Sequence, residues 1–360
     1  MKKTLISIAV LGALSNAAFA QSNVTIYGIV DAGLVAERGG KAGNVTKVAS
    51  GVGSASRIGF RGTEDLGGGL SAVFVLEGGF AADTGVGDAA GLFQRQSYVG
   101  LVSKEAGSLT LGRQYTPMYN AFVQVADPFQ AGLAGSAKNL FSASGASVRI
   151  SNSVNYKTPT YSGFSGEFQY GVGEQAKADA GRQMGIALAY ANGPLNARLA
   201  YNNRNNDTAV GGGVPVVNRE YAHNTLFAAN YDFNVVKGYF AYSSDKGPTS
   251  SPIPNPTAFT ATAVAASTDS DTILLGATAP IQGTAGTLIA SYIRKDDNNA
   301  ANRDADQWAV GYSYALSKRT STYVAYAKIN NKRGASYTVG NNADVGTGDK
   351  AFNVGIKHTF

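Results

Sequence analysis

Segments of about ten residues with alternating apolar and polar side chains recur along most of this 360-residue chain. Alternation with a period of two is the pattern of a β-strand with one apolar and one polar face. The pattern shows no domain boundary and no helical period. It predicts one all-β unit of sixteen strands, at 24–37, 56–66, 70–82, 92–103, 107–116, 150–160, 164–173, 182–192, 195–205, 222–232, 235–245, 271–280, 286–296, 305–317, 320–331 and 350–360.

The connections between these segments alternate in length. Every second connection is short. These connections are turns of two to four residues, such as 192–194 and 233–234, except for 281–286, which is longer. The others are mostly long and polar: 38–55, 83–91, 117–149, 206–221, 246–270 and 332–349. Short turns at one edge and long loops at the other describe an up-and-down barrel across an outer membrane. Ten tilted residues cover roughly 25 Å of hydrocarbon, whereas a soluble β-sandwich gives no reason for the alternation.

The charged residues share one face of the predicted strands. Ile58 and Phe60 lie opposite Arg57, and Trp308 and Val310 lie opposite Gln307. Because lipid excludes unpaired charge, the charged face is expected to line a wet interior. A sixteen-stranded barrel is too wide for side chains to fill, so the interior is predicted to be a water channel. The segments 271–280 and 320–331 do not show which face is apolar.

Composition excludes several other classes of protein. The chain has no cysteine and two histidines, so neither disulfides nor a transition-metal site are expected, and no cofactor is predicted. A net charge of +6 spread over the whole chain does not indicate a nucleic-acid-binding protein, which would have a concentrated basic patch. No stretch after the N-terminus reaches 18 apolar residues, as a membrane helix requires. GxSxG, HExxH and GxxxxGK[ST] motifs are absent, so no enzyme activity is predicted.

The two ends of the chain carry signals for export. Residues 1–20 combine Lys2 and Lys3 with a short apolar stretch and a small-residue cleavage site, Ala18-Phe19-Ala20, and they are predicted to be a signal peptide. Its removal leaves residues 21–360 with a net charge of +4. The chain ends at Phe360, on the apolar face of the last strand, where aromatic side chains gather at the edge of a membrane barrel.

Motifs along the chain resemble those of general Gram-negative porins, most closely the betaproteobacterial type. The resemblance covers the whole mature chain and includes "NVTIYGIVDAGL" (23–34), "SRIGFRGTEDLGGGL" (56–70), "GSLTLGRQYTP" (107–117) and the terminal Phe360. It implies a homotrimer of sixteen-stranded barrels with the third loop folded into the lumen. It further implies contact with outer-membrane lipid and lipopolysaccharide, and recognition of Phe360 by the outer-membrane barrel assembly machinery.

The resemblance also suggests the residues of a pore constriction. The loop 117–149 corresponds to the family's inward-folded loop, and "DPF" (127–129) suggests Asp127 as an acid lining the pore. Basic residues on the wall correspond to Arg57 in "SRIGF", Arg95 in "FQRQSYVGL" and Arg149 in "RISNSVNY", with Glu77 as a nearby inward acid. The alternatives are that 117–149 is an ordinary extracellular loop and that each arginine merely pairs with a wall carboxylate.

Arg113 departs from the pattern of inward charges. It shares a face with Leu109 and Leu111, and its exposure to lipid at the membrane midplane would cost roughly 2–4 kcal/mol. Arg113 is therefore a candidate for a subunit interface, which would cover it.

The sequence as a whole predicts a passive porin of the outer membrane that admits small hydrophilic solutes and prefers anions. The preference is expected because Arg57, Arg95 and Arg149 outnumber Asp127 and Glu77 at the constriction. Two alternatives remain open at this stage: a substrate-specific channel, and a barrel that serves chiefly as an adhesin or surface antigen.

Overall fold

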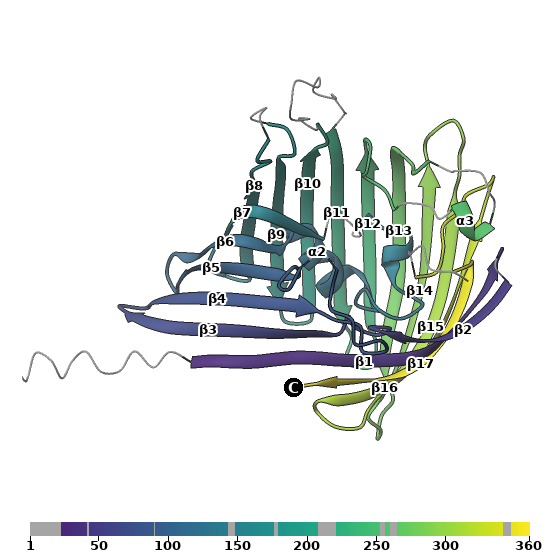
Figure 1. Ribbon diagram of the computed structural model, residues 1–360, viewed down its shortest axis with the longest axis horizontal. Coiled ribbons are helices and arrows are strands. Elements are labelled where there is room, and N and C mark those ends of the chain that lie inside the picture. The colour runs from purple at the N-terminus through teal and green to yellow at the C-terminus, as the bar shows by residue number, and fades with distance from the viewer. Residues whose placement is uncertain are drawn as a thin grey trace, which may run out of the picture.

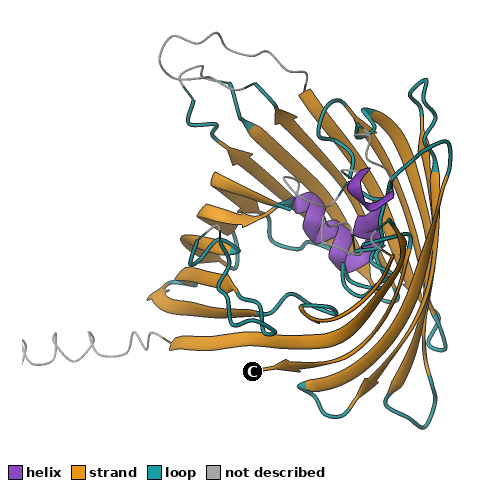
Figure 2. Ribbon diagram, turned by 45° about the vertical axis from the view of Figure 1, so that its right-hand side comes forward, coloured by secondary structure: helices purple, strands orange, loops and turns teal. Residues whose placement is uncertain are grey.

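The computed structural model describes residues 23–41, 43–89, 91–142, 148–175, 179–207, 221–252, 256–259, 265–340 and 347–360. They form one closed antiparallel β-barrel with the third long connection inside it (Figures 1 and 2). The predicted signal peptide, residues 1–20, lies outside the described residues. None of the described helices has the length and apolar character needed to cross a membrane.

The barrel wall consists of antiparallel strands that each pair with the next along the chain, except that β2 and β3 both pair with β1 and not with each other. Their bounds are β1 (Asn23–Gly40), β2 (Gly43–Ser50), β3 (Arg57–Gly67), β4 (Leu70–Gly79), β5 (Gln96–Ser103), β6 (Gly107–Tyr115), β7 (Arg149–Lys157), β8 (Phe164–Gly171), β9 (Gln183–Asn192), β10 (Leu195–Asn205), β11 (Tyr221–Asp232), β12 (Lys237–Lys246), β13 (Asp269–Pro280), β14 (Gly286–Asp297), β15 (Ala305–Ala315), β16 (Thr320–Asn331) and β17 (Lys350–Thr359). The short helices are α2 (Pro117–Ala121), η2 (Phe122–Ala126), η3 (Ala137–Asn139) and α3 (Pro256–Phe259).

Strands β2 and β3 share one position in the wall, which therefore has sixteen positions. β3 pairs with the first half of β1, from Asn23↔Thr63 to Ile29↔Arg57, and β2 pairs with the second half, from Ala32↔Ser50 to Gly40↔Gly43. The prediction that 38–55 is entirely a loop was wrong at β2. Val45 and Val48 stand three residues apart, on opposite faces of the strand, so β2 shows no alternation that could have revealed it.

The outer surface of the wall is apolar. Side chains that alternate outward along β1, such as Val24 and Leu34, are more than half exposed at 56% and 52%. Trp308 and Val310 of β15 are also exposed, whereas Gln307, the residue before Trp308 on the same strand, is buried. This is the expected arrangement for strands that present an apolar face to lipid and a polar face to the lumen.

The largest buried apolar cluster lies inside the barrel. Phe122, Phe141, Met118 and Leu140 of the third long connection are fully buried against the inner wall. The wall makes room for them with small residues, including Ala200, Ala228, Ala241, Ala309 and Ala325. The same cluster explains why the sequences of 271–280 and 320–331 do not show which face is apolar: Leu274 and Ile329 belong to this buried cluster, so an apolar side chain is not confined to the outer face there.

The C-terminal residue completes the closure of the barrel beside β1 (Figure 1). β17 pairs with β1 from Ile29↔Thr359 to Arg38↔Lys350. Phe360 extends this pairing, because its amide donates to the Gly28 carbonyl and the Gly28 amide donates to the Phe360 carbonyl, both at 3.1 Å. Gly28 leaves space for the Phe360 ring, which a Cβ at that position would meet. The terminal aromatic residue is therefore fixed in the wall.

Candidate functional site

Residues 117–142, which we call the inner loop, follow the C-terminal end of β6, and their short helices lie inside the barrel (Figure 2). Thr116 caps α2, since its side-chain oxygen accepts a hydrogen bond from the Tyr119 amide at 2.9 Å, and Pro117 occupies the first helical position. The chain continues through the π-helical turn η2 to Asp127. The sequence therefore starts a helix at the point where the wall ends, and this helix directs the loop inward.

Asp127 folds the inner loop and does not line the opening. Its side chain is 1% exposed, and its carboxylate accepts hydrogen bonds from the amides of Phe129, Ala131 and Ala137 at 2.9, 2.9 and 3.0 Å. Burial raises the pKa of this carboxyl to about 6, although the three amides act in the opposite direction. The prediction of Asp127 as a pore-lining acid is corrected, because the carboxylate satisfies the loop's own backbone.

Side chains of the wall hold the inner loop in place. Gln307 of β15 is fully buried; its Oε1 accepts a hydrogen bond from Asn139 Nδ2 at 2.7 Å, and its Nε2 donates to the Gly135 carbonyl at 3.1 Å. At the far end of the loop, Ser142 Oγ donates to Asp245 Oδ1 of β12 at 2.8 Å. These bonds fix the loop against the side of the lumen formed by the later strands.

The space left between the inner loop and the earlier strands is a cavity of about 600 Å³, which we call the constriction cavity. Four basic residues line it, Arg57, Arg95, Arg149 and Lys138, and none of the described lining residues is Asp or Glu. The other lining residues are Gly51, Ser54, Ala55, Tyr115, Tyr119, Asn120, Val123, Gln124, Gln130, Ala131, Val148 and Gly340. Its described lining is therefore purely cationic in formal charge.

Glu77 lies directly behind two of these arginines. Its Oε1 is 2.8 Å from Arg95 Nε, and its Oε2 is 3.7 Å from Arg57 Nε and accepts a hydrogen bond from Tyr27 at 3.0 Å. Because Glu77 is 4% exposed, its charge is compensated by the arginines rather than presented to the lumen. The structure thus brings Arg57, Arg95 and Glu77 together. This contact also agrees with the alternative that the arginines pair with a carboxylate of the wall.

Tyr115 connects the remaining arginine to this group. Its hydroxyl accepts hydrogen bonds from Arg95 and, at 3.3 Å, from Arg149 Nη2, and the Arg149 guanidinium lies 4.8 Å from the centre of its ring. Tyr119 of the inner loop stacks on Tyr115, with ring centres 5.0 Å apart. The sequence analysis missed Tyr115, because an aromatic residue at the end of a strand does not by itself indicate such a contact.

Lys138 is the second residue that the sequence analysis missed at the site. It is the only basic residue within 117–142, and that isolation was the available signal. Burial lowers the pKa of its ammonium group; the nearby Asp127 opposes this, while Arg149 and Arg95 lower the pKa further. The charge that the inner loop brings to the constriction is therefore positive, whereas a negative one was expected.

Arg113 lies away from the constriction cavity, at a bulge in the pairing of β6 with β7 between Gly112 and Gln114. Its Nη1 donates to Ser151 Oγ at 2.6 Å and its Nε to the Gln94 carbonyl. The neighbouring outward side chains of Leu109 and Leu111 are exposed. Two of its nitrogen atoms are thus hydrogen-bonded within the chain.

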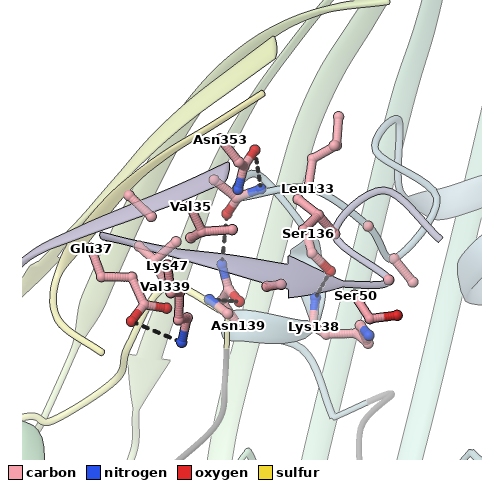
Figure 3. A pocket seen from close by; sticks show the side chains of 18 residues that line it. Val35, Glu37, Lys47, Ser50, Leu133, Ser136, Lys138, Asn139, Val339 and Asn353 are labelled. Atoms are coloured by element: carbon pink, nitrogen blue, oxygen red, sulfur yellow. Dashed lines mark hydrogen bonds and ion pairs between the residues drawn. The ribbon is translucent and has the colours of Figure 1, made fainter. Parts of the chain in front are cut away.

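A smaller cavity of about 190 Å³ lies on the other side of the inner loop, against β1, β2 and β17 (Figure 3). Lys47 and Glu37 form an ion pair of 3.2 Å at its edge. Lys138 lines both cavities, so the inner loop is a partition between them. Among the residues that the structure describes, no group of three or more histidine or carboxylate side chains is arranged to hold a metal ion.

Comparisons with known proteins agree with this architecture. The chain matches the model of the Gram-negative porin family over residues 7–335. It is 34% identical to outer membrane porin protein 32 of Delftia acidovorans over the full length of both chains. It is also 34% identical to an outer membrane porin of Bordetella pertussis, with 91% of this chain and 94% of the relative covered.

Among solved structures, the anion-selective porin from Comamonas acidovorans superposes with a TM-score of 0.73 and 30% sequence identity, over 94% of this chain and all of that one. The closed sixteen-position barrel, the loop inside its lumen and these matches lead to one conclusion: the chain is an outer-membrane channel protein and belongs to the family of Gram-negative porins.

Proposed function

We propose that this porin is a diffusion channel that prefers anions, and that the charge of the constriction cavity causes this preference. The observation that carries the proposal is the lining of that cavity, in which Arg57, Arg95, Arg149 and Lys138 meet no exposed carboxylate among the described residues. Glu77 is compensated by two arginines, and Asp127 is buried in the inner loop. The family role is that of a channel rather than of an enzyme.

The physical basis is the field inside a narrow aqueous neck. Charges between walls of low dielectric constant focus their field into the water, so a surplus of cations raises the local concentration of anions. Small hydrophilic solutes and anions then cross down their gradients without any chemical step. Support comes from the related Comamonas acidovorans protein, which is described as anion-selective.

The direct test is the zero-current potential of single channels in a planar bilayer across a modest KCl gradient. If the channel prefers anions, the zero-current potential has the sign expected when chloride crosses more readily than potassium. The preference should weaken in concentrated salt, because the Debye length falls from about 10 Å at 0.1 M to about 3 Å at 1 M.

We further infer that three barrels form a homotrimer in contact with outer-membrane lipid and lipopolysaccharide, and that Arg113 lies at the subunit interface. The support is that Arg113 follows Leu109 and Leu111 on β6, whose side chains are exposed. A guanidinium facing lipid at the midplane would cost about 2–4 kcal/mol, whereas a neighbouring subunit would cover it.

The trimer makes a prediction for heat stability in mild detergent. Arg113→Ala should lower the temperature at which the trimer dissociates, because it removes a charged group that we place at the interface. Semi-native gel electrophoresis over a temperature series measures this. A monomeric wild-type protein by light scattering argues against the trimer, and an Arg113→Ala trimer of unchanged heat stability argues only against the role of Arg113.

A further inference from the structure

Residues 51–56 join β2 to β3, and they leave the plane of the wall; we call them the wall bend. The pairing of β2 with β1 ends at Ser50, and that of β3 with β1 begins at Arg57. On β1, the partners of these two residues are Ala32 and Ile29, so two residues of β1 lie opposite six of the wall bend. A chain with surplus residues opposite its partner bulges out of the ladder, and the wall bend is therefore displaced from the sheet.

The wall bend reaches the inner loop inside the barrel. The amide of Leu133, in the inner loop, donates to the Val52 carbonyl at 2.6 Å. A Cβ at Gly132 would meet the Gly53 carbonyl, so the absence of a side chain at Gly132 lets the two backbones pack against each other. The wall bend therefore spans the space between the wall and the inner loop.

The wall bend contributes to the lining of both cavities beside the inner loop. Gly51, Ser54 and Ala55 line the constriction cavity. Gly51 and Val52 line the smaller cavity against β1, β2 and β17 (Figure 3). Gly51 thus lies at both cavities, as Lys138 of the inner loop does. The partition between the two cavities is therefore built from the wall bend together with the inner loop.

Asp31 of β1 holds the wall bend in place. Its side chain is 0% exposed, and its two carboxylate oxygens accept from the Gly53 amide at 3.1 and 3.2 Å. The Tyr323 hydroxyl of β16 donates to Asp31 Oδ1 at 2.7 Å. The Asp31 carbonyl also accepts from the Gly51 amide at 2.8 Å and from Ser56 Oγ at 3.1 Å. One residue of the wall thus fixes the start, the middle and the end of the wall bend.

We propose that the wall bend is a second constriction element beside the inner loop, and that Asp31 is the positioning residue through which it sets the size limit for solutes. Residues 51–56 have no ionisable side chain, so the wall bend acts on the width of the opening and not on its charge. Without the Asp31 carboxylate the Gly53 amide loses its acceptor, the wall bend moves away from the inner loop, and the two cavities join into a wider opening. This inference concerns solute size and goes beyond the proposed preference for anions.

The first test measures the swelling of liposomes that contain the full-length porin in neutral sugars of different size. Asp31→Ala should raise the rate with raffinose, a trisaccharide, relative to that with arabinose by about twofold or more, because a wider opening favours the larger solute. Asp31→Asn keeps an acceptor oxygen and a similar volume, so its ratio should lie closer to the wild-type value. Gln169→Ala is the matched control, since Gln169 of β8 is also 0% exposed and has no hydrogen bond to the wall bend within the described residues.

The second test leaves Asp31 unchanged and labels the wall bend itself. The chain has no cysteine, so Ala55→Cys introduces a single thiol at an exposed position of the wall bend. Benzyl methanethiosulfonate forms a mixed disulfide with this thiol and releases methanesulfinate, which adds a neutral, bulky group. The single-channel conductance should fall by about twofold, because the group narrows the opening. Ala285→Cys, at an exposed position of the turn before β14, is the matched control and should keep its conductance after labelling.

The two tests separate the wall bend from the residue that positions it. A raffinose-to-arabinose ratio in Asp31→Ala no higher than in Gln169→Ala overturns the role of Asp31, and equal ratios in Asp31→Ala and Asp31→Asn overturn positioning through the acceptor oxygens. Unchanged conductance of Ala55→Cys, with complete labelling shown by mass spectrometry, overturns the wall bend as a constriction element. Folding of every variant is checked by heat-modifiable mobility.

Discussion

Asp127 places a carboxylate in the interior of the inner loop, where three backbone amides donate to it. Removing the carboxylate leaves buried amides without an acceptor, which lowers the free energy of unfolding by about 1–3 kcal/mol for each buried amide. Asp127→Ala should therefore loosen the inner loop, lower the midpoint of thermal unfolding and increase the noise of the open channel. Asp127→Asn keeps an acceptor oxygen and should change both properties less. Equal behaviour of the two variants would contradict this role.

The buried carboxyl also makes stability depend on pH. The pKa of Asp127 is raised to about 6 from an ordinary value of 3.8, so between about pH 4 and 6 the folded loop binds a proton that the unfolded chain releases. Its contribution to stability is greatest below about pH 4 and is lost as the pH rises through about 6. Across that window the unfolding midpoint of Asp127→Asn should fall less with rising pH than that of the wild type.

At the scale of single residues, the sequence predicted which side chains face the lumen but not what each one contacts. Arg57, Arg95 and Glu77 were expected to point inward because strand alternation determines facing, and they form one group. Asp127 and Lys138 lie in the inner loop, whose fold depends on contacts between residues distant in sequence, so no periodicity could show which of the two is buried.

At the scale of elements, the wall strands were predictable and the attachment of the inner loop was not. The strands follow from alternation and turn chemistry, both of which are local. The exception is β2, whose two valines lie on opposite faces. The loop is held by Gln307, Asp245 and Asn353, from three different strands, through bonds such as that from the Ala134 amide to Asn353 Oδ1 at 3.3 Å.

The attachment through Gln307 gives a prediction for the inner loop as a unit. Gln307→Leu removes the bonds to Asn139 and to the Gly135 carbonyl, so the loop should become more mobile and the single-channel current noisier, with a less uniform conductance. Gln169→Leu is the matched control, because Gln169 is equally buried but, within the described part of the chain, donates only to Ser153 of the wall. Similar noise in both variants would show that the loop does not depend on Gln307.

At the scale of the whole molecule, closure of the barrel joins the first and last strands, and the chain ends within that seam. We propose that the terminal aromatic residue is the signal read by the barrel assembly machinery. Deleting Phe360 removes the two bonds to Gly28 and an aromatic side chain that is 42% exposed at the outer surface. Export across the inner membrane should continue while the amount of folded barrel falls, measured as heat-modifiable protein in outer-membrane fractions. A normal amount would contradict the proposal.

The account depends most directly on the sign of the charge at the constriction, which a salt-gradient recording of single channels measures. In a modest KCl gradient the wild-type zero-current potential should have the sign of chloride preference. Lys138→Gln should reduce it, and the double change Arg57→Glu with Arg95→Glu should move it towards cation preference, whereas Lys318→Gln, at an exposed turn, should leave it unchanged. A wild-type channel that prefers potassium, or a preference that survives the double charge reversal, would contradict the account.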